Sequence, residues 1–233
     1  ESTMNHYIQQ KQQQILENQT NFYTSTGLHV YLQEPVDGID VANVISRIEE
    51  SLPKHFFYNI EMIIFGWFEE FDERSIEAFY DSGTLYVSNV QHDEEDLIEN
   101  IIHEIAHSLE NTYGFEIYGD EKIKNEFLRK RKHLHDMLWA SGYKIPASFF
   151  MNTEYDQEFD NLLYQKIGYE ELDQHVSGLF INSYAATSLR EYFATLFTDY
   201  YINSNHNYIK KISPAVYEKI SILQNNEDML DSM

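Results

Sequence analysis

Cysteine is absent from this chain of 233 residues, and glycine (9) and proline (4) are scarce. Without cysteine the chain has no disulfide bonds, no thiolate-bound zinc, no iron–sulfur cluster and no thiol nucleophile. So few glycines and prolines exclude collagen-like and linker-rich chains. No apolar run approaches the ~18 residues that a transmembrane helix needs, so we expect no membrane span.

Positive charge is also scarce, since 16 lysines and arginines stand against 39 acidic residues and give a net charge of −23. Phosphate groups would repel such a chain, so we expect no nucleic-acid partner. Apolar residues make up 42% of the chain and aromatic residues 15%. This composition supports a globular core, and the length fits one domain.

The spacing of the apolar residues predicts an α+β fold with a mainly helical C-terminal half. Residues 1–27 begin polar and Gln-rich, and we interpret them as an N-terminal helix or arm ahead of a single domain over 28–233. We expect strands at 28–33 and 60–67 and a hairpin over 75–88, which turns at residues 81–83. The expected helices cover 40–51, 93–112, 120–140 and 188–203, with a last helix after Pro214; short helices and loops fill 145–180.

The helix over 93–112 has the strongest pattern. Asp93 is a plausible N-cap, acidic residues fill the first turn, and Gly114 is the expected stop. Apolar residues recur every four positions, at Leu97, Ile101, Ile105 and Leu109. This pattern indicates an amphipathic helix with one buried face.

The same helix contains His103-Glu104-Ile105-Ala106-His107. Two histidines four residues apart lie one turn apart on one face, where both imidazoles can bind one Zn²⁺. Zinc lowers the pKa of a bound water, and a neighbouring carboxylate can take its proton. We therefore predict Zn²⁺ as cofactor, with His103 and His107 as ligands and Glu104 as general base. The alternative is a pair of solvent-facing histidines on a surface helix.

A catalytic zinc site has three protein ligands and one open position, so a third ligand must come from elsewhere. We favour Glu191, early in the helix over 188–203, because small Ala194 one turn on allows close helix packing. The competing interpretation is a capping box, Ser188-x-x-Glu191, in which Glu191 only satisfies the helix start. Other candidates for the third position are Glu110, His133, His135, His175 and Asp199; Glu110 is better placed as an outer partner of His107.

His103-Glu104-x-x-His107, followed by Tyr184 and then Glu191-Tyr-Phe-Ala, resembles the catalytic domain of anthrax lethal factor and the related clostridial Pro-Pro endopeptidases. In that family a tyrosine stands seven residues before the ligand glutamate, and the interval from Tyr184 to Glu191 is the same. The resemblance implies that Glu191 is the third zinc ligand and that Tyr184 stabilises the oxyanion.

The resemblance covers about residues 28–203 and implies a zincin-like metalloprotease fold. In that fold residues 28–112 are a lobe with a small mixed sheet and the active-site helix, and 113–233 are a helical lobe. An edge strand within 76–90 would pair with the substrate backbone. The implied function is a zinc metalloendopeptidase that acts on a protein or peptide, as a monomer. A secreted or extracellular bacterial protein fits the resemblance, including a toxin domain delivered to a host cell.

The stretch between His107 and Glu191 is longer than expected for compact members of that family, and we interpret 113–180 as carrying an insertion. Its expected helix over 120–140 contains six of the sixteen basic residues, namely Lys122, Lys124, Arg129, Lys130, Arg131 and Lys132. This basic cluster predicts either a solvated helix face or a docking site for an acidic substrate segment.

Two other functions use the same motif. A catalytically inactive lethal-factor-like module would keep the metal for protein binding or structure, although such a module has no need of Glu104. An aminopeptidase would need an acidic anchor for the substrate's free amine, for which Glu170 and Glu171 are available. Neither the cleavage site nor a preference for proline follows from the sequence.

Overall fold

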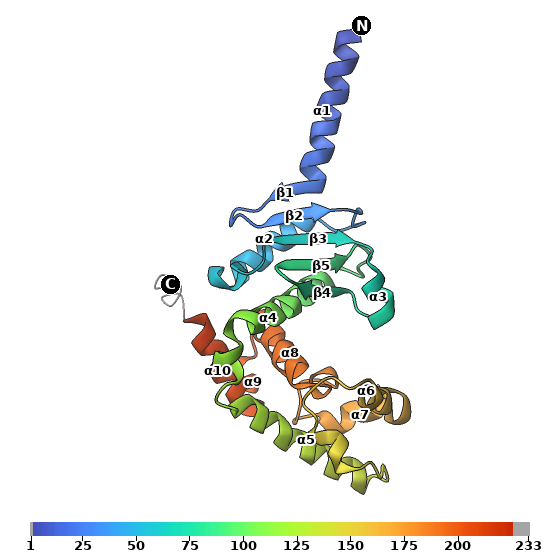
Figure 1. Ribbon diagram of the computed structural model, residues 1–233, viewed down its shortest axis with the longest axis vertical. Helices are drawn as coiled ribbons and strands as arrows, with labels where there is room; N and C mark the ends of the chain where they lie inside the picture. Colours follow the sequence, from blue (N-terminus) through green and yellow to red (C-terminus); the bar gives the residue numbers. More distant parts are fainter. Residues whose placement is uncertain (1, 226–233) are drawn as a thin grey trace. The chain divides into compact units, whose positions relative to one another are not determined.

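The computed structural model describes the backbone of residues 2–225 and the side chains of residues 4–15 and 20–225. It confirms the α+β class, with a small mixed sheet. The chain divides into two compact units, one that ends at Ser108 and one that begins at Leu109. Figure 1 shows that the strands belong to the first unit and that the described part of the second is built from helices.

The sheet has five strands in the order β1-β2-β3-β5-β4. They are β1 (Asn21–Tyr23), β2 (His29–Leu32), β3 (Met62–Gly66), β4 (Ala78–Asp81) and β5 (Thr84–Ser88). The three inner strands are parallel, and β1 and β4 are antiparallel edges. The expected strands and the hairpin with its edge strand are confirmed. Strand β1 was not predicted, because it falls in the stretch interpreted as an arm.

The hairpin turns tightly at Ser82 and Gly83, which lie between the paired residues Asp81 and Thr84. Both turn residues have positive φ angles, 48° and 90°. A two-residue hairpin turn of this kind needs positive φ at both positions, which glycine adopts without strain. The local sequence therefore sets the register of the edge strand.

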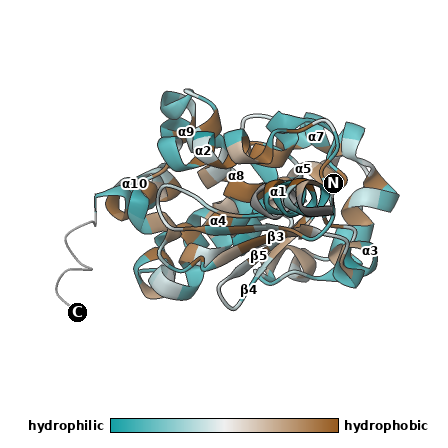
Figure 2. Ribbon diagram, turned by 90° about the horizontal axis from the view of Figure 1, so that it is seen from above, coloured by the Kyte–Doolittle hydropathy of each residue, from teal (hydrophilic) through white to brown (hydrophobic). Residues whose placement is uncertain are grey.

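One face of the sheet forms the core of the first unit. Val30, Ile63 and Leu85 pair in one row across β2, β3 and β5, and all three are buried. The row of paired residues one position further along these strands faces the opposite side of the sheet and is partly exposed, because successive side chains of a strand point to opposite faces. The central strands are coloured as hydrophobic in Figure 2.

The helices of the first unit are α1 (Ser2–Thr20), α2 (Val41–Ser51), α3 (Glu69–Arg74) and the start of α4 (Glu94–Tyr118), with a 3-10 turn η1 (Lys54–Phe57). Helix α2 presents the buried stripe Val41, Val44, Ile45 and Ile48. Helix α1 is exposed along residues 4–15 and continues into β1 (Figure 1). The short helix α3 was not predicted.

The second unit contains the rest of α4, then α5 (Lys122–Ala140), α6 (Gln157–Asn161), α7 (Tyr169–Val176), α8 (Leu189–Ile202), α9 (His206–Ile212) and α10 (Pro214–Gln224). Single turns join them: η2 (Ala147–Met151), η3 (Leu162–Ile167) and η4 (Tyr184–Ala186). The helices expected at 120–140, at 188–203 and after Pro214 are confirmed, and α9 is an addition.

The expected interruption of the motif helix next to Gly114 is confirmed. Two helical segments of α4 meet at a kink at Tyr113, where φ is −111° and ψ is 21°, and the second segment, which was not predicted, ends at Tyr118. The glycine that follows its end is Gly119, where an added Cβ would lie 2.5 Å from the carbonyl oxygen of Phe115. Glycine is needed there because the backbone approaches itself closely, whereas nothing crowds Gly114.

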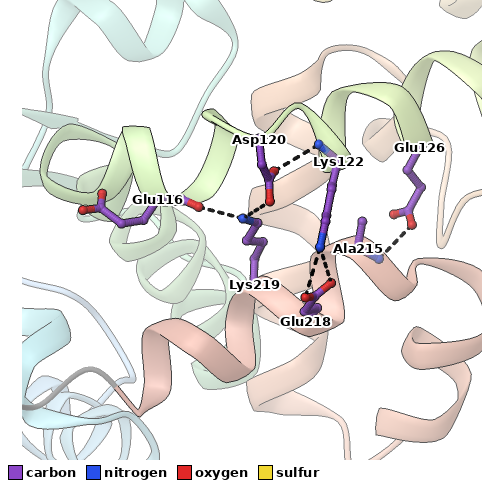
Figure 3. Close-up of polar contacts among 7 residues, drawn as sticks. All are labelled: Glu116, Asp120, Lys122, Glu126, Ala215, Glu218 and Lys219. Atoms are coloured by element: carbon purple, nitrogen blue, oxygen red, sulfur yellow. Dashed lines mark hydrogen bonds and ion pairs between the residues drawn. The ribbon is translucent and has the colours of Figure 1, made fainter.

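A lysine of α10 binds the C-terminal end of α4 (Figure 3). Lys219 Nζ donates to the carbonyl oxygen of Glu116 at 2.9 Å and to Asp120 Oδ2 at 2.6 Å. Next to it Lys122 forms an ion pair with Glu218 at 3.3 Å. A cation at a helix C-terminus interacts favourably with the dipole and with the last carbonyls, so these contacts tie α10 to the α4–α5 junction.

A buried polar network joins α5, α8 and α10. The hydroxyl of Tyr192 lies 2.7 Å from Glu126 Oε1 and 2.8 Å from Ser213 Oγ. Lys130 Nζ donates to the same serine at 2.8 Å, and Glu126 Oε2 accepts from the backbone N–H of Ala215. All four polar side chains are buried and hydrogen-bonded. A buried polar network with every group paired favours one specific arrangement of the helices that it connects.

Two residues of the basic cluster fit neither predicted role. Lys130 and Arg131 are buried, with 5% and 0% of their surfaces exposed, so they form neither a solvated face nor a docking site. Arg129, Lys122 and Lys132 remain exposed. Within residues 2–225, no helix is both long and apolar enough to cross a membrane.

Candidate metal centre

The motif residues lie on α4, one turn apart, at the edge of its buried stripe. Asp93 begins this helix by accepting the backbone N–H of Asp96 at 2.8 Å. His103, Glu104 and His107 are half-buried, between the fully buried Ile101 and Ile105 and solvent. All three side chains are thus partly covered, which differs from two histidines that simply face solvent.

The structure brings the three side chains together. One ligand atom from each of His103, Glu104 and His107 lies within 4.8 Å of the other two. The two imidazole rings are 4.9 Å apart between centroids, at an interplanar angle of 78°. Imidazole nitrogens and carboxylate oxygens are the kinds of ligand atom that Zn²⁺ binds. The three side chains therefore form a candidate metal site.

The two other predicted site residues belong to the second unit. Tyr184 opens the short turn η4, with 44% of its surface exposed, and Glu191 lies in the first turn of α8, half-buried. The assignment of Glu191 as third ligand and of Tyr184 as oxyanion donor stays a prediction.

The predicted helix start at Ser188 is confirmed in one respect. Ser188 is the N-cap of α8, and its Oγ accepts the backbone N–H of Glu191 at 3.2 Å. This bond uses the main chain of Glu191 and not its carboxylate. Capping and metal binding are therefore compatible roles for the same residue.

A charged neighbourhood surrounds the first turn of α8. Arg190 Nε lies 2.5 Å from Glu110 Oε2, which joins α8 to α4 one turn after His107. Burial lowers the pKa of Arg190, but the charge and hydrogen bond of Glu110 outweigh it and raise that pKa. Burial, with Glu110 and Glu191 adding to it, raises the pKa of Tyr118 well above its ordinary value. Tyr118 is thus a protonated phenol close to Glu191, which the sequence alone did not single out.

The other candidates for the third ligand have different surroundings. Glu110 Oε2 lies 2.5 Å from Arg190 Nε, and its role as an outer partner of His107 stays a prediction. His135 Nε2 lies 2.9 Å from the carbonyl oxygen of Ile145. The remaining candidates are spread over three helices: His133 on α5, His175 on α7 and Asp199 on α8.

A second group of possible ligand atoms was not predicted. His92, Asp93 and Asp96 place one such atom each within 4.8 Å of the others at the start of α4. Asp93 already caps the helix. The positive end of the helix dipole, which favours anions, makes this a poor place for a cation.

Comparisons with models of protein families, with curated proteins and with solved structures found no match.

Proposed function

We propose that this chain is a zinc-dependent endopeptidase with a zincin-like, lethal-factor-like catalytic fold. The observation that carries the proposal is the grouping of His103, Glu104 and His107 within 4.8 Å on one rigid helix. Two imidazoles that can bind the ion, beside a carboxylate that can act as a base, are the groups that such an enzyme needs. Zn²⁺ bound there would polarise a peptide carbonyl and make a bound water acidic.

Each residue of the site has one proposed task. His103 and His107 hold the ion, and Glu191 completes the protein ligands. Glu104 accepts a proton from the attacking water and passes it to the leaving amine. Tyr184, which is partly exposed, donates a hydrogen bond to the oxyanion. The substrate is a protein or peptide, and a secreted bacterial protein is the setting that we propose.

The test is a mass-spectrometric cleavage profile of a mixed peptide library that includes Pro-rich and basic sequences. Wild type is compared with Glu104→Gln and with Glu99→Gln, an exposed glutamate on the same helix. We expect new cuts with wild type and Glu99→Gln and none with Glu104→Gln, although all three bind zinc in equal amount. Equal cleavage by Glu104→Gln would overturn the mechanism.

Two further experiments test the assignment of Glu191 as a ligand and distinguish the competing functions. Glu191→Gln should weaken zinc binding in a chelator competition, whereas unchanged affinity would remove Glu191 from the site. Cleavage of N-acetylated peptides excludes an aminopeptidase. Zinc binding by wild type without any cleavage points to a metal-binding module instead.

A further inference from the structure

Arg131 is a fully buried arginine whose donors point at main-chain carbonyls. Its Nε donates to the carbonyl oxygen of Ala186 at 2.6 Å, and its Nη2 to that of Thr187 at 2.8 Å. Nη1 donates to the carbonyl oxygen of Phe150 at 3.3 Å. The planar guanidinium has the geometry for several fixed donors at once, which a lysine ammonium lacks.

Aromatic rings complete the surroundings of this side chain. The guanidinium carbon lies 4.2 Å from the ring centroid of Phe159 and 4.7 Å from that of Phe127. No carboxylate within the described residues forms an ion pair with Arg131. Burial lowers its pKa to about 9, so it stays charged at neutral pH. Burying an unpaired charge is costly, so volume alone does not explain an arginine at this position.

The carbonyls that Arg131 holds lie between the two predicted site residues of the second unit. Ala186 and Thr187 connect the turn that carries Tyr184 to the cap of the helix that carries Glu191. Thr187 Oγ1 also donates to the carbonyl oxygen of Tyr184 at 2.7 Å. The segment from Tyr184 to Glu191 is therefore anchored at its middle by one side chain from α5.

We propose that Arg131 is a positioning residue, which fixes the phenol of Tyr184 relative to the carboxylate of Glu191 by binding the backbone between them. This inference rests on the proposed function, since it assigns a purpose to the geometry of two proposed site residues. It also gives a role to a member of the basic cluster that contacts no solvent. Misplacement of reacting groups by about 1 Å can cost about 100-fold in rate.

The experiment uses Arg131→Lys and Arg131→Met, with Arg129→Met as the control, because Arg129 is an exposed arginine on the same helix. Hydrogen exchange of the backbone amides of residues 184–191 is measured in the zinc-free protein. We expect exchange there to accelerate at least about tenfold in both Arg131 variants, with less change in Arg131→Lys. The control should exchange like wild type.

Steady-state kinetics on a peptide cleaved by wild type supply the second readout. We expect kcat to fall about 100-fold in Arg131→Met with KM little changed, and to recover in part in Arg131→Lys. Folded variants with wild-type exchange over 184–191, or with unchanged kcat, would overturn the inference. If neither variant folds, the Arg131 Nε–H of wild type is followed by NMR, where slow exchange supports the inference and exchange as fast as in free arginine overturns it.

The two proposals fail in different ways. Wild type that neither binds zinc nor cleaves peptides would end the proposed function. The exchange measurement needs neither metal nor substrate, so it still decides whether Arg131 orders residues 184–191.

Discussion

The contact between Ser188 and Glu191 bears on two interpretations of one residue. The sequence presented a choice between a capping box and a metal ligand at Glu191. The structure shows that Ser188 Oγ accepts the main-chain N–H of Glu191, and this bond does not involve the carboxylate. A sequence motif does not say which atoms it uses, so the capping pattern alone did not argue against Glu191 as a ligand.

Lys130 is a residue whose charge opposes folding at neutral pH. Burial lowers its pKa from 10.5 to about 8, although the nearby Glu126 acts in the other direction. Between these two pH values the unfolded chain binds more protons than the folded one. The free energy of unfolding therefore rises with pH in this window, and the cost is fully present below pH 8.

We predict that replacing Lys130 by Met removes this pH dependence. The free energy of unfolding of wild type, relative to that of Lys130→Met, should increase by roughly 3 kcal/mol between pH 8 and pH 10.5. Urea unfolding of both proteins across this range measures the difference. Parallel pH profiles would show that the buried ammonium is not the titrating group.

Helix α4 has a second segment that the sequence pattern did not predict. The expected stop at Gly114 coincides with the kink at Tyr113, and the second segment follows it to Tyr118. Tertiary contacts supply the reason, since Lys219 from α10 binds the carbonyl oxygen of Glu116 and stabilises the last turn. No local pattern in 113–118 contains that information, because the stabilising residue lies about a hundred positions away.

Helix α8 depends on its cap, and we predict that Ser188→Ala lowers the free energy of unfolding by about 1 kcal/mol. The loss arises because the backbone N–H of Glu191 is left without its acceptor. Asp40→Ala is the matched comparison, since Asp40 caps α2 by accepting from Asn43 at 3.1 Å. Chemical denaturation of the three proteins measures both effects. Wild-type stability in Ser188→Ala alongside a loss in Asp40→Ala would contradict the assignment.

The whole molecule carries a net charge of −23, and the ion pairs of Arg47, Lys122 and Lys124 within the described residues are exposed. Self-repulsion of like charges destabilises a compact state, and salt screens it over about 10 Å at 0.1 M.

We therefore predict that raising sodium chloride from 20 mM to 500 mM increases the melting temperature by about 2–4 °C, which corresponds to roughly 1 kcal/mol. Differential scanning calorimetry measures the shift. Choline chloride should have the same effect if screening is the cause, whereas a flat or falling melting temperature would contradict it.

The sequence by itself determined the α+β class, the inner strands, the hairpin with its glycine turn and the helix that carries His103, Glu104 and His107. These features follow from local periodicity, turn chemistry and the one-turn spacing of the motif, all of which act over a few neighbouring residues. Only the tertiary structure decided the end of α4, the buried places of Lys130 and Arg131, and the anchoring of residues 186 and 187. Each of these depends on groups far apart in the chain, whose desolvation and pairing no local pattern encodes.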